Sequence, residues 1–440
     1  MPAEARGTSS KLSWMQGREW LLTAGPAVLL VLAAFALTLR FTDPGPPKIV
    51  AMTTGGETGA YYAFGKRYAE ILARSGVKLD VRSSAGSVEN LVRLKDQSSG
   101  VGIALLQGGI GNSKDTPGVN SLGRVFHEPL WVFYRGDTID KLGQLKGKRI
   151  AVGAEGSGTR VLAMALLQAN EISEGTAVLS PLTAQPAADA LKAGLLDAVF
   201  LALAPQAPLI QQLLRSSDFK LMNFSQADAY AKLYPYLAKL TLPQGVIDLV
   251  ANIPAQDVTL VAPTAVLVAR EDVHPAIVAL LAEAAQDVHG KVSLFAKPGE
   301  FPTATDPDFN MDADALRFYK SGPTFWKRIF PFWIANLVER LVVFLVPLLT
   351  ILLPLSKAVP ALYRWRVRQR MLVRYKQMKG IEARVADLPI GASTAGVVSE
   401  LDALEEAVSR MPVPTQFSEQ YYDLRSHLTH VRQRLAARVA

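Results

Sequence analysis

Two long apolar stretches frame the middle of the chain and predict membrane-spanning helices. The first runs from Trp20 to Leu39, 20 consecutive residues without a charge, or about 30 Å of helix, which matches a bilayer's hydrocarbon core. A secretory signal peptide is the alternative, because Arg6, Lys11 and Arg18 precede the stretch and Ala34-Phe35-Ala36 resembles a cleavage site. An h-region is normally only about 7–15 residues long. The length therefore favours an uncleaved anchor over 20–39, and either interpretation exports the residues that follow.

The second apolar stretch covers 329–356 and is interrupted only by the adjacent pair Glu339 and Arg340. A buried core helix is the alternative. Bases without an acid among them follow the stretch, as is typical of a cytoplasmic flank; they are Lys357, Arg364, Arg366, Arg368, Arg370, Arg374, Lys376 and Lys379. We expect a protein of the inner (cytoplasmic) membrane with a cytoplasmic N-terminus over 1–19, an exported domain over 41–328, a second transmembrane helix over 329–356 and a cytoplasmic segment over 357–440.

Between the apolar stretches, short β-branched runs alternate with segments of helical periodicity. This alternation predicts an α/β fold with parallel sheets. The expected strands are 48–52, 78–82, 102–106, 130–134, 149–152, 198–201 and 258–269. Two α/β lobes fit this length, and we expect the chain to enter the second at the turn Lys146-Gly147-Lys148. Lobe 1 would then comprise about 47–145 and 256–325, lobe 2 about 146–255, and a ligand would bind in the crevice between them.

The last segment predicts two helices. Apolar residues recur at four-three spacing from Val397 to Met411 and again from Phe417 to Leu435, and Pro412-Val413-Pro414 separates the two runs. Such a pattern is typical of an antiparallel helical hairpin with one apolar seam. The runs are too short to indicate a long coiled coil.

Charge and composition exclude several function classes. The net charge is +8, but residues 41–356 contain equal numbers of acids and bases, so the surplus lies near the predicted spans and in the tail. This distribution indicates contact with the lipid bilayer and not with nucleic acid, which would require a basic surface on the main domain. The absence of cysteine excludes disulfides, thiolate metal sites and a cysteine nucleophile.

Catalytic and metal-binding signatures are absent as well. Residues 59–66 have the wrong glycine spacing for a phosphate-binding loop, and Gly156-Ser157-Gly158 lacks the spacing of a nucleophile elbow. The five histidines form no metal-ligand motif. We therefore expect no enzymatic activity, no metal and no cofactor.

Three loops combine glycines with small hydroxyl residues, and each follows an expected strand and opens a helix. They cover 53–62, 83–90 and 153–159. Backbone N–H groups at a helix N-terminus can bind an anion, and glycine allows close approach. One such loop is more often an ordinary helix cap. Three together favour a site for a carboxylate.

The same residues resemble those of a known family, the TAXI-type solute receptors of TRAP transporters. The resemblance covers about 48–290. It is carried in order by Gly55-Gly56-x-x-Gly59-x-Tyr61-Tyr62, Ser84-Ala85-Gly86-Ser87-Val88-Glu89-Asn90-Leu91, Leu145 to Gly153 leading into Gly156-Ser157-Gly158-Thr159, Ala190 to Ala198, and Tyr234-Pro235-Tyr236 with Pro243-x-Gly245. It implies a two-lobed periplasmic-binding-protein (type II) fold that closes on a small organic anion, such as a carboxylate or amino acid, and delivers it to a membrane permease.

The resemblance also implies the residues of the site. Gly59, Tyr61 and Tyr62 would line the cleft from lobe 1, although Tyr61 belongs to an apolar helical stripe and core packing is its alternative role. Ser87 and Asn90 would donate hydrogen bonds to the ligand, and Gln107 would reach in from a strand end. Further expected members of the site are Ser157, Gly158 and Thr159 from lobe 2 and Asp197 as a partner for an ammonium group, with a cap of the turn as the alternative role of Asp197. Outside the shared motif, Arg82 and Arg160 are the nearest candidates for a carboxylate clamp.

The sequence thus predicts an extracytoplasmic solute receptor for a TRAP-type secondary transporter, with permease subunits as its protein partners. The known receptors of this type are mostly free or lipid-tethered, whereas this chain adds a second span and a tail. A membrane-anchored ligand sensor that signals through the helical tail is therefore the first alternative. An envelope hydrolase is the second alternative, although the sequence offers no evident general base for catalysis at Ser157.

Overall fold

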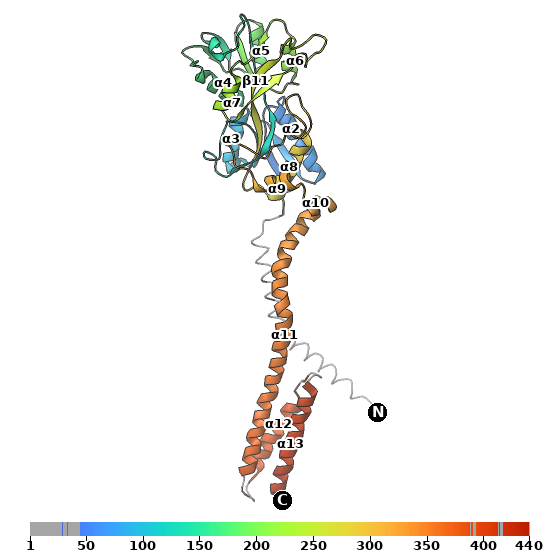
Figure 1. Ribbon diagram of the computed structural model, residues 1–440. Coiled ribbons are helices and arrows are strands. Elements are labelled where there is room, and N and C mark those ends of the chain that lie inside the picture. Colours follow the sequence, from blue (N-terminus) through green and yellow to red (C-terminus); the bar gives the residue numbers. More distant parts are fainter. Residues whose placement is uncertain are drawn as a thin grey trace. The chain divides into compact units, whose positions relative to one another are not determined.

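The computed structural model describes Leu29, Ala33 and residues 45–387, 389, 393–411, 413 and 417–439. The chain divides into two units, Pro44–Val338 and a unit of Met1–Asp43 with Glu339–Ala440 (Figure 1). The predicted span over 20–39 lies outside the described residues, apart from Leu29 and Ala33.

The first lobe of the Pro44–Val338 unit is built on a mixed sheet with the strand order β10-β11-β3-β1-β2, and β4 also pairs with β11. Its three parallel strands are β1 (Ile49–Thr53), β2 (Lys78–Arg82) and β3 (Ile103–Gln107), and β4 (Val119–His127) runs antiparallel to β11 (Val258–Arg270). The helices of this lobe are α2 (Ala60–Arg74), α3 (Ser87–Lys95), α8 (Pro275–His289), α9 (Ala313–Ser321) and α10 (Phe325–Ile329).

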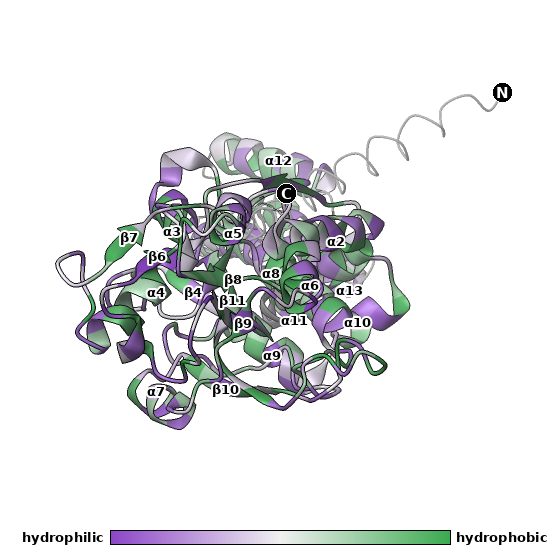
Figure 2. Cartoon of the chain, turned by 90° about the horizontal axis from the view of Figure 1, so that it is seen from above, coloured by the Kyte–Doolittle hydropathy of each residue, from purple (hydrophilic) through white to green (hydrophobic). Residues whose placement is uncertain are grey.

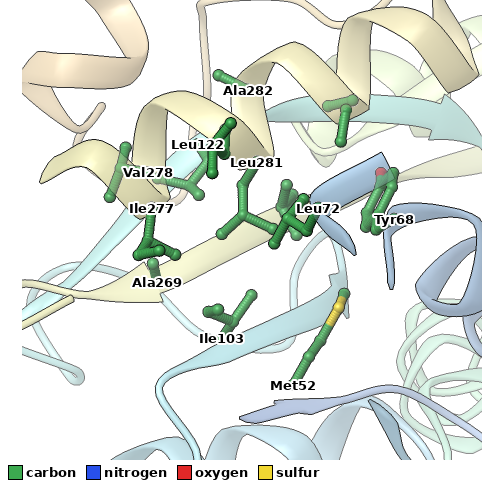
Figure 3. Close-up of a cluster of buried hydrophobic side chains, with 14 of the residues drawn as sticks. Met52, Tyr68, Leu72, Ile103, Leu122, Ala269, Ile277, Val278, Leu281 and Ala282 are labelled. Atoms are coloured by element: carbon green, nitrogen blue, oxygen red, sulfur yellow. The ribbon is translucent and has the colours of Figure 1, made fainter. Parts of the chain in front are cut away.

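The hydrophobic pattern explains how this lobe packs. In α2, Tyr61, Gly65, Tyr68 and Leu72 are buried at helical spacing, so one stripe of the helix faces the sheet. Figure 3 shows this core, in which Tyr68 and Leu72 lie with Ile277 and Leu281 of α8 over the side chains of the central strands. Tyr61 belongs to the same core cluster, which confirms the alternative role that its apolar stripe predicted.

The second lobe is built on a sheet with the order β7-β6-β8-β5-β9. Its strands are β5 (Leu130–Tyr134), β6 (Arg149–Ala151), β7 (Val178–Ser180), β8 (Ala198–Ala202) and β9 (Lys220–Leu221), and its helices are α4 (Gly158–Ala169), α5 (Ala184–Lys192), α6 (Pro208–Leu214) and α7 (Ala227–Leu233). In Figure 2, β8 has the colour of hydrophobic residues throughout, as its burial requires, while helices such as α2 carry both colours. The predicted two-lobed α/β fold is confirmed.

The chain crosses between the lobes at two places in the described structure. The first is the short connection from β4 to β5, so lobe 2 begins at Leu130 and not at the predicted Lys146, because β5 pairs antiparallel with β8 in the second sheet. The second crossing is β11 itself. Its first half pairs with β10 (Leu237–Leu242) and packs in the core of lobe 2, while its second half pairs with β3 and β4 in lobe 1.

The other unit contains a bundle of three helices where a hairpin was predicted. The helices α12 (Ala395–Ser409) and α13 (Ser418–Val439) form the expected pair, but the end of α11 (Phe332–Asp387) packs against both of them. The shared core includes Ile381 of α11, Leu404 of α12 and Leu428 of α13. The hairpin prediction was therefore incomplete, because α12 and α13 still have apolar surface after they pair, and the end of α11 covers it.

Among the helices that the structure describes, none is long and apolar enough to cross a membrane. The predicted span over 329–356 falls on the end of α10 and the start of α11, and the side chains of 340–348, 351, 352 and 356 lie outside the described part. Both spans stay predictions.

Candidate functional site

The three glycine-rich loops lie at the carboxyl ends of parallel strands. The first connects β1 to α2 and ends with Gly59 as the N-cap, the second connects β2 to α3 with Gly86 as the N-cap, and the third connects β6 to α4 with Ser157 as the N-cap. In open α/β sheets, the crevice outside the carboxyl ends of the strands is where ligands bind. The loops thus place the N-termini of three helices at the edges of the two sheets where ligands bind in such folds.

Two of these loops meet across the lobes. The Gln107 side chain, at the end of β3, donates from Nε2 to the Gly158 backbone oxygen at 3.0 Å. Gly86 in lobe 1 comes so close to lobe 2 that an added Cβ would lie 3.2 Å from Ser157 Cα, and this glycine has a φ of +139°. Glycine is needed there for both reasons. The contact brings Gln107, Ser157 and Gly158 together, as the sequence predicts.

Asn90 lies behind this contact, inside lobe 1. It is fully buried, and its carbonyl oxygen accepts hydrogen bonds from the Thr53 and Ser84 hydroxyls, each at 2.7 Å. Its amide donates to the backbone oxygens of Thr54 and, at 2.9 Å, Leu105. An Asn side chain has two donors and one carbonyl acceptor, so Asn90 has no donor left for a ligand. The structure assigns it to positioning the loops, which corrects the predicted role.

A row of polar side chains runs from the crossing between lobes to the contact. The Tyr61 hydroxyl donates to Glu128 Oε2 at 2.6 Å, and the Ser87 side chain acts on Tyr61 in the sense that lowers its pKa. The Ser87 hydroxyl oxygen accepts from the Gln107 backbone N–H at 2.9 Å, and Gln107 bonds to Gly158. Ser87 is buried between Tyr61 and Gln107, and Gln107 makes the bond to lobe 2.

Glu128 is a site residue that the sequence analysis missed. It lies in the connection between β4 and β5, where no motif or periodicity marks it, and only the folded chain shows that it is buried. Burial raises the pKa of its carboxyl to about 7, while the Tyr61 hydrogen bond lowers it. Burial also raises the pKa of Tyr61 well above its usual value, with Glu128 adding to the effect.

Arg160 lies in the first turn of α4, directly after the third loop. Ser157 caps α4, with its hydroxyl donating to the Ala154 oxygen at 2.6 Å and accepting from the Arg160 N–H at 3.2 Å. Thr159 packs its side chain against the Gly153 backbone. Within the described part of the chain, the Arg160 Nη1 atom is buried and has no hydrogen-bond partner. A guanidinium nitrogen left in this way at a helix N-terminus is suited to an anionic ligand.

Asp197 lies elsewhere, and its predicted role as an ammonium partner is corrected. It immediately precedes β8, where the parallel strands β6 and β8 begin. The loop that leads to Gly158 lies at the opposite, carboxyl end of β6. Arg149 donates to its carboxylate from the backbone N–H at 2.8 Å and from Nη2 at 2.7 Å, and these bonds hold its pKa below the usual value. Asp197 therefore links the start of β6 to the start of β8 by hydrogen bonds.

Tyr62 and Arg82 line a pocket of about 520 Å³ on lobe 1. Ser83, three residues before Gly86, lies in its wall, but none of the residues of the interlobe contact lines it. Arg82 donates to Asp80 and to the Ser99 oxygen, so its guanidinium is already partnered. The remaining lining residues are Glu57, Val81, Arg93, Ser99 and Val101. Arg82 lines this pocket and Arg160 does not, so the two candidates for a carboxylate clamp do not share it.

Metal binding has no candidate in the described residues, since no three histidine, cysteine or carboxylate side chains gather there to hold an ion.

Comparison with known proteins shows the family. The model of the NMT1-like family matches residues 52–291, and the chain belongs to this family. The structure resembles the periplasmic aliphatic sulphonate binding protein SsuA from Escherichia coli, at 13% identity and a TM-score of 0.35 over 55% of this chain and 69% of that one. It also resembles an ancestral arginine-binding protein bound to arginine, at 13% identity and a TM-score of 0.35 over 55% and 92% of the chains.

A histidine kinase sensor domain with similarity to periplasmic binding proteins is similar at 15% identity and a TM-score of 0.36, over 55% of this chain and 90% of that one. Likeness at this level does not identify a ligand. The sheets themselves define the class, because in each lobe the first parallel strand lies between the second and the third, and the strand next to the third is antiparallel. The chain has a two-lobed, periplasmic-binding-protein-like fold.

Proposed function

We propose that the protein is an extracytoplasmic solute receptor that binds a small organic anion between its lobes and passes it to a TRAP-type secondary transporter. The ordered motifs of the TAXI-type receptors support the transporter class. The observation that carries the binding role is the Gln107–Gly158 contact, because it brings two anion-suited helix N-termini together from separate lobes. The protein binds its ligand without chemical change and is not an enzyme.

Binding works through the difference in contacts between open and closed lobes. An anion held by the start of α4 and by the free Arg160 Nη1 gains further hydrogen bonds when lobe 1 closes over it. A ligand shifts a conformational equilibrium only by its differential affinity for the two states. Residues that contact the opposite lobe, Gln107 above all, therefore determine how far the ligand shifts the equilibrium toward the closed state.

The proposed location is the inner membrane, with spans over 20–39 and 329–356, the binding domain outside and both termini in the cytoplasm. The eight bases from Lys357 to Lys379, with no acid among them, support this orientation. A tethered receptor reaches only a permease beside it. Tethering compensates by raising the local concentration near that partner to about the millimolar range.

The test is a thermal-shift screen of the purified full chain against amino acids, dicarboxylates, keto acids, sulfonates and neutral sugars. A ligand at 100 times its Kd stabilises the folded state by about 2.7 kcal/mol, which gives a clear rise in Tm. We expect anions to give the shift and Arg160→Ala to abolish it, while Arg215→Ala, which changes an exposed arginine of the same lobe, retains it. Shifts with neutral sugars alone, or none across the panel, would contradict the proposal.

One observation favours ligand sensing as a second candidate function. Phe332 near the start of α11 is buried in the core of lobe 1, and Ile381 near its end is buried in the tail bundle, so one helix contributes to both cores. Hydrogen exchange of α12 and α13, measured with and without the hit from the screen, distinguishes the candidates. Ligand-dependent protection in these helices supports sensing, and unchanged exchange supports transport alone.

A further inference from the structure

A buried carboxyl lies where the two lobes join. Glu128 is in the connection from β4 to β5, and its backbone N–H donates to the Pro263 oxygen of β11 at 2.9 Å. Both crossings between the lobes therefore meet at this residue. Its side chain points toward the first turn of α2, where the Tyr61 hydroxyl bonds to Oε2.

This carboxyl has fewer partners than buried carboxyls normally have. Acids are almost never buried without a cation or several hydrogen bonds, because desolvation of the charge is costly. In the described part of the chain no Lys, Arg or His pairs with Glu128, and the Tyr61 hydroxyl is its one hydrogen-bonded side chain. Asp197 shows the contrast, since Arg149 satisfies it with several bonds. Glu128 is 9% exposed and belongs to the buried residues.

The position of Glu128 connects it to the proposed ligand site. Tyr61 is bonded to Glu128, and Ser87 acts on Tyr61 in the sense that lowers its pKa. Ser87 is in turn bonded to Gln107, which contacts Gly158 in lobe 2. The two helices that begin beside this row of side chains, α3 and α4, and the unpartnered Nη1 of Arg160 are suited to an anion. An unpaired acid is then available for a cationic group on the same ligand.

We propose that Glu128 accepts the ammonium group of the ligand, so that this receptor selects amino acids over carboxylic acids that lack an amine. The inference rests on the proposed function and assigns to Glu128 the role that the sequence analysis gave to Asp197. Pairing with an ammonium supplies the cation that the buried carboxyl lacks. Loss of a hydrogen bond between charged groups in such a site weakens binding about 10- to 100-fold.

The experiment compares matched pairs of probes by calorimetry on the purified full chain: L-glutamate with glutarate, L-aspartate with succinate, and L-leucine with 4-methylpentanoate. We expect the wild type to bind at least one amino acid about 10- to 100-fold more tightly than its des-amino partner. Glu128→Gln, which keeps an acceptor for Tyr61, should remove that preference. Glu271→Gln, an exposed acid of the same lobe, is the matched control and should retain it.

A pH titration of the wild type gives a second readout that needs no variant. The titratable side chain facing Glu128 is that of Tyr61 from α2, and its raised pKa keeps it uncharged near neutrality. With a carboxyl pKa of about 7 in the free protein, the ionised fraction falls about tenfold from pH 8 to pH 6. Amino-acid affinity should fall by about that factor, while affinity for a des-amino probe should show no such fall.

The outcomes separate the inference from the function on which it rests. Tighter binding of the des-amino acids, or an amino-acid preference that survives in Glu128→Gln, overturns the role of Glu128 and leaves the receptor function standing. Absence of binding by every probe and by the wider anion panel overturns both. Loss of the preference in Glu128→Gln, together with the fall in affinity at low pH, supports the inference.

Discussion

Asn90 shows at the scale of one residue how a motif position can serve the fold and not the ligand. All of its hydrogen-bonding groups are used within lobe 1, where it joins the ends of β1 and β3 to the loop before α3. The motif correctly indicated that this position requires a particular polar side chain. It did not distinguish a side chain that touches the ligand from one that holds the loops which do, because both need a polar residue at the start of the same helix.

This role predicts that Asn90→Ala destabilises the domain. Its removal takes a partner from the buried Thr53 hydroxyl and from the Leu105 oxygen, while the half-buried Ser84 hydroxyl and the Thr54 oxygen keep the bond between them. Each unsatisfied buried group costs about 1–3 kcal/mol. We expect the free energy of unfolding in urea to fall by about 3 kcal/mol or more. Asn170→Ala, which removes a partly buried amide from lobe 2, should cost about 1 kcal/mol. Equal costs for the two variants would contradict the positioning role.

Charged residues were the least predictable part of the site. Ser87 and Gln107 lie at the carboxyl ends of strands in lobe 1, and Ser157 and Gly158 follow β6 in lobe 2. The parallel-sheet pattern is sufficient to place each pair at that edge of its own sheet. Glu128 and Asp197 are acids in connections, and their environments depend on which strands flank them. The sequence contains no signal for that, since Glu128 owes its burial to the pairing of β4 and β5 with separate sheets.

At the scale of elements, the strands were predicted most accurately from the sequence. Each expected strand exists within a residue or so of its predicted bounds, because buried parallel strands are short, continuous β-branched runs. β4 was missed, since Gly123 and Arg124 interrupt its apolar pattern, and its register with β11 shifts nearby. β5 was predicted as a strand but assigned to the wrong lobe, because hydrophobicity does not say which sheet a buried strand joins.

The loop before α3 gives a prediction at the same scale. Gly86→Ala forces an L-residue into a φ of +139° and places its Cβ 3.2 Å from Ser157 Cα, so closure should become less favourable. We expect about tenfold weaker binding of the strongest ligand in the screen, measured by calorimetry. Gly143→Ala is the control, since an added Cβ there meets no atom within 4 Å and should leave affinity unchanged. Unchanged affinity in Gly86→Ala would show that the bound state does not use this contact.

Charge distribution leads to the prediction at the scale of the whole molecule. The neutral middle and the basic flank after residue 356 predict that the binding domain and the tail lie on opposite sides of a membrane. The natural chain has no cysteine, so one introduced thiol reports the side on which it lies. Ser217 in lobe 2 and Ser399 in α12 are both exposed positions for such a thiol.

We expect a membrane-impermeant maleimide to label Ser217→Cys in spheroplasts and to label Ser399→Cys only after lysis. Both variants should react equally in detergent, which controls for intrinsic thiol reactivity, and the cysteine-free parent should not react. Labelling of Ser399→Cys in intact spheroplasts would place the tail outside and remove the basis for cytoplasmic signalling. Protection of both positions until lysis would mean that the binding domain is not exported. A receptor role would then require its ligand in the cytoplasm, where delivery to an importing permease has no purpose.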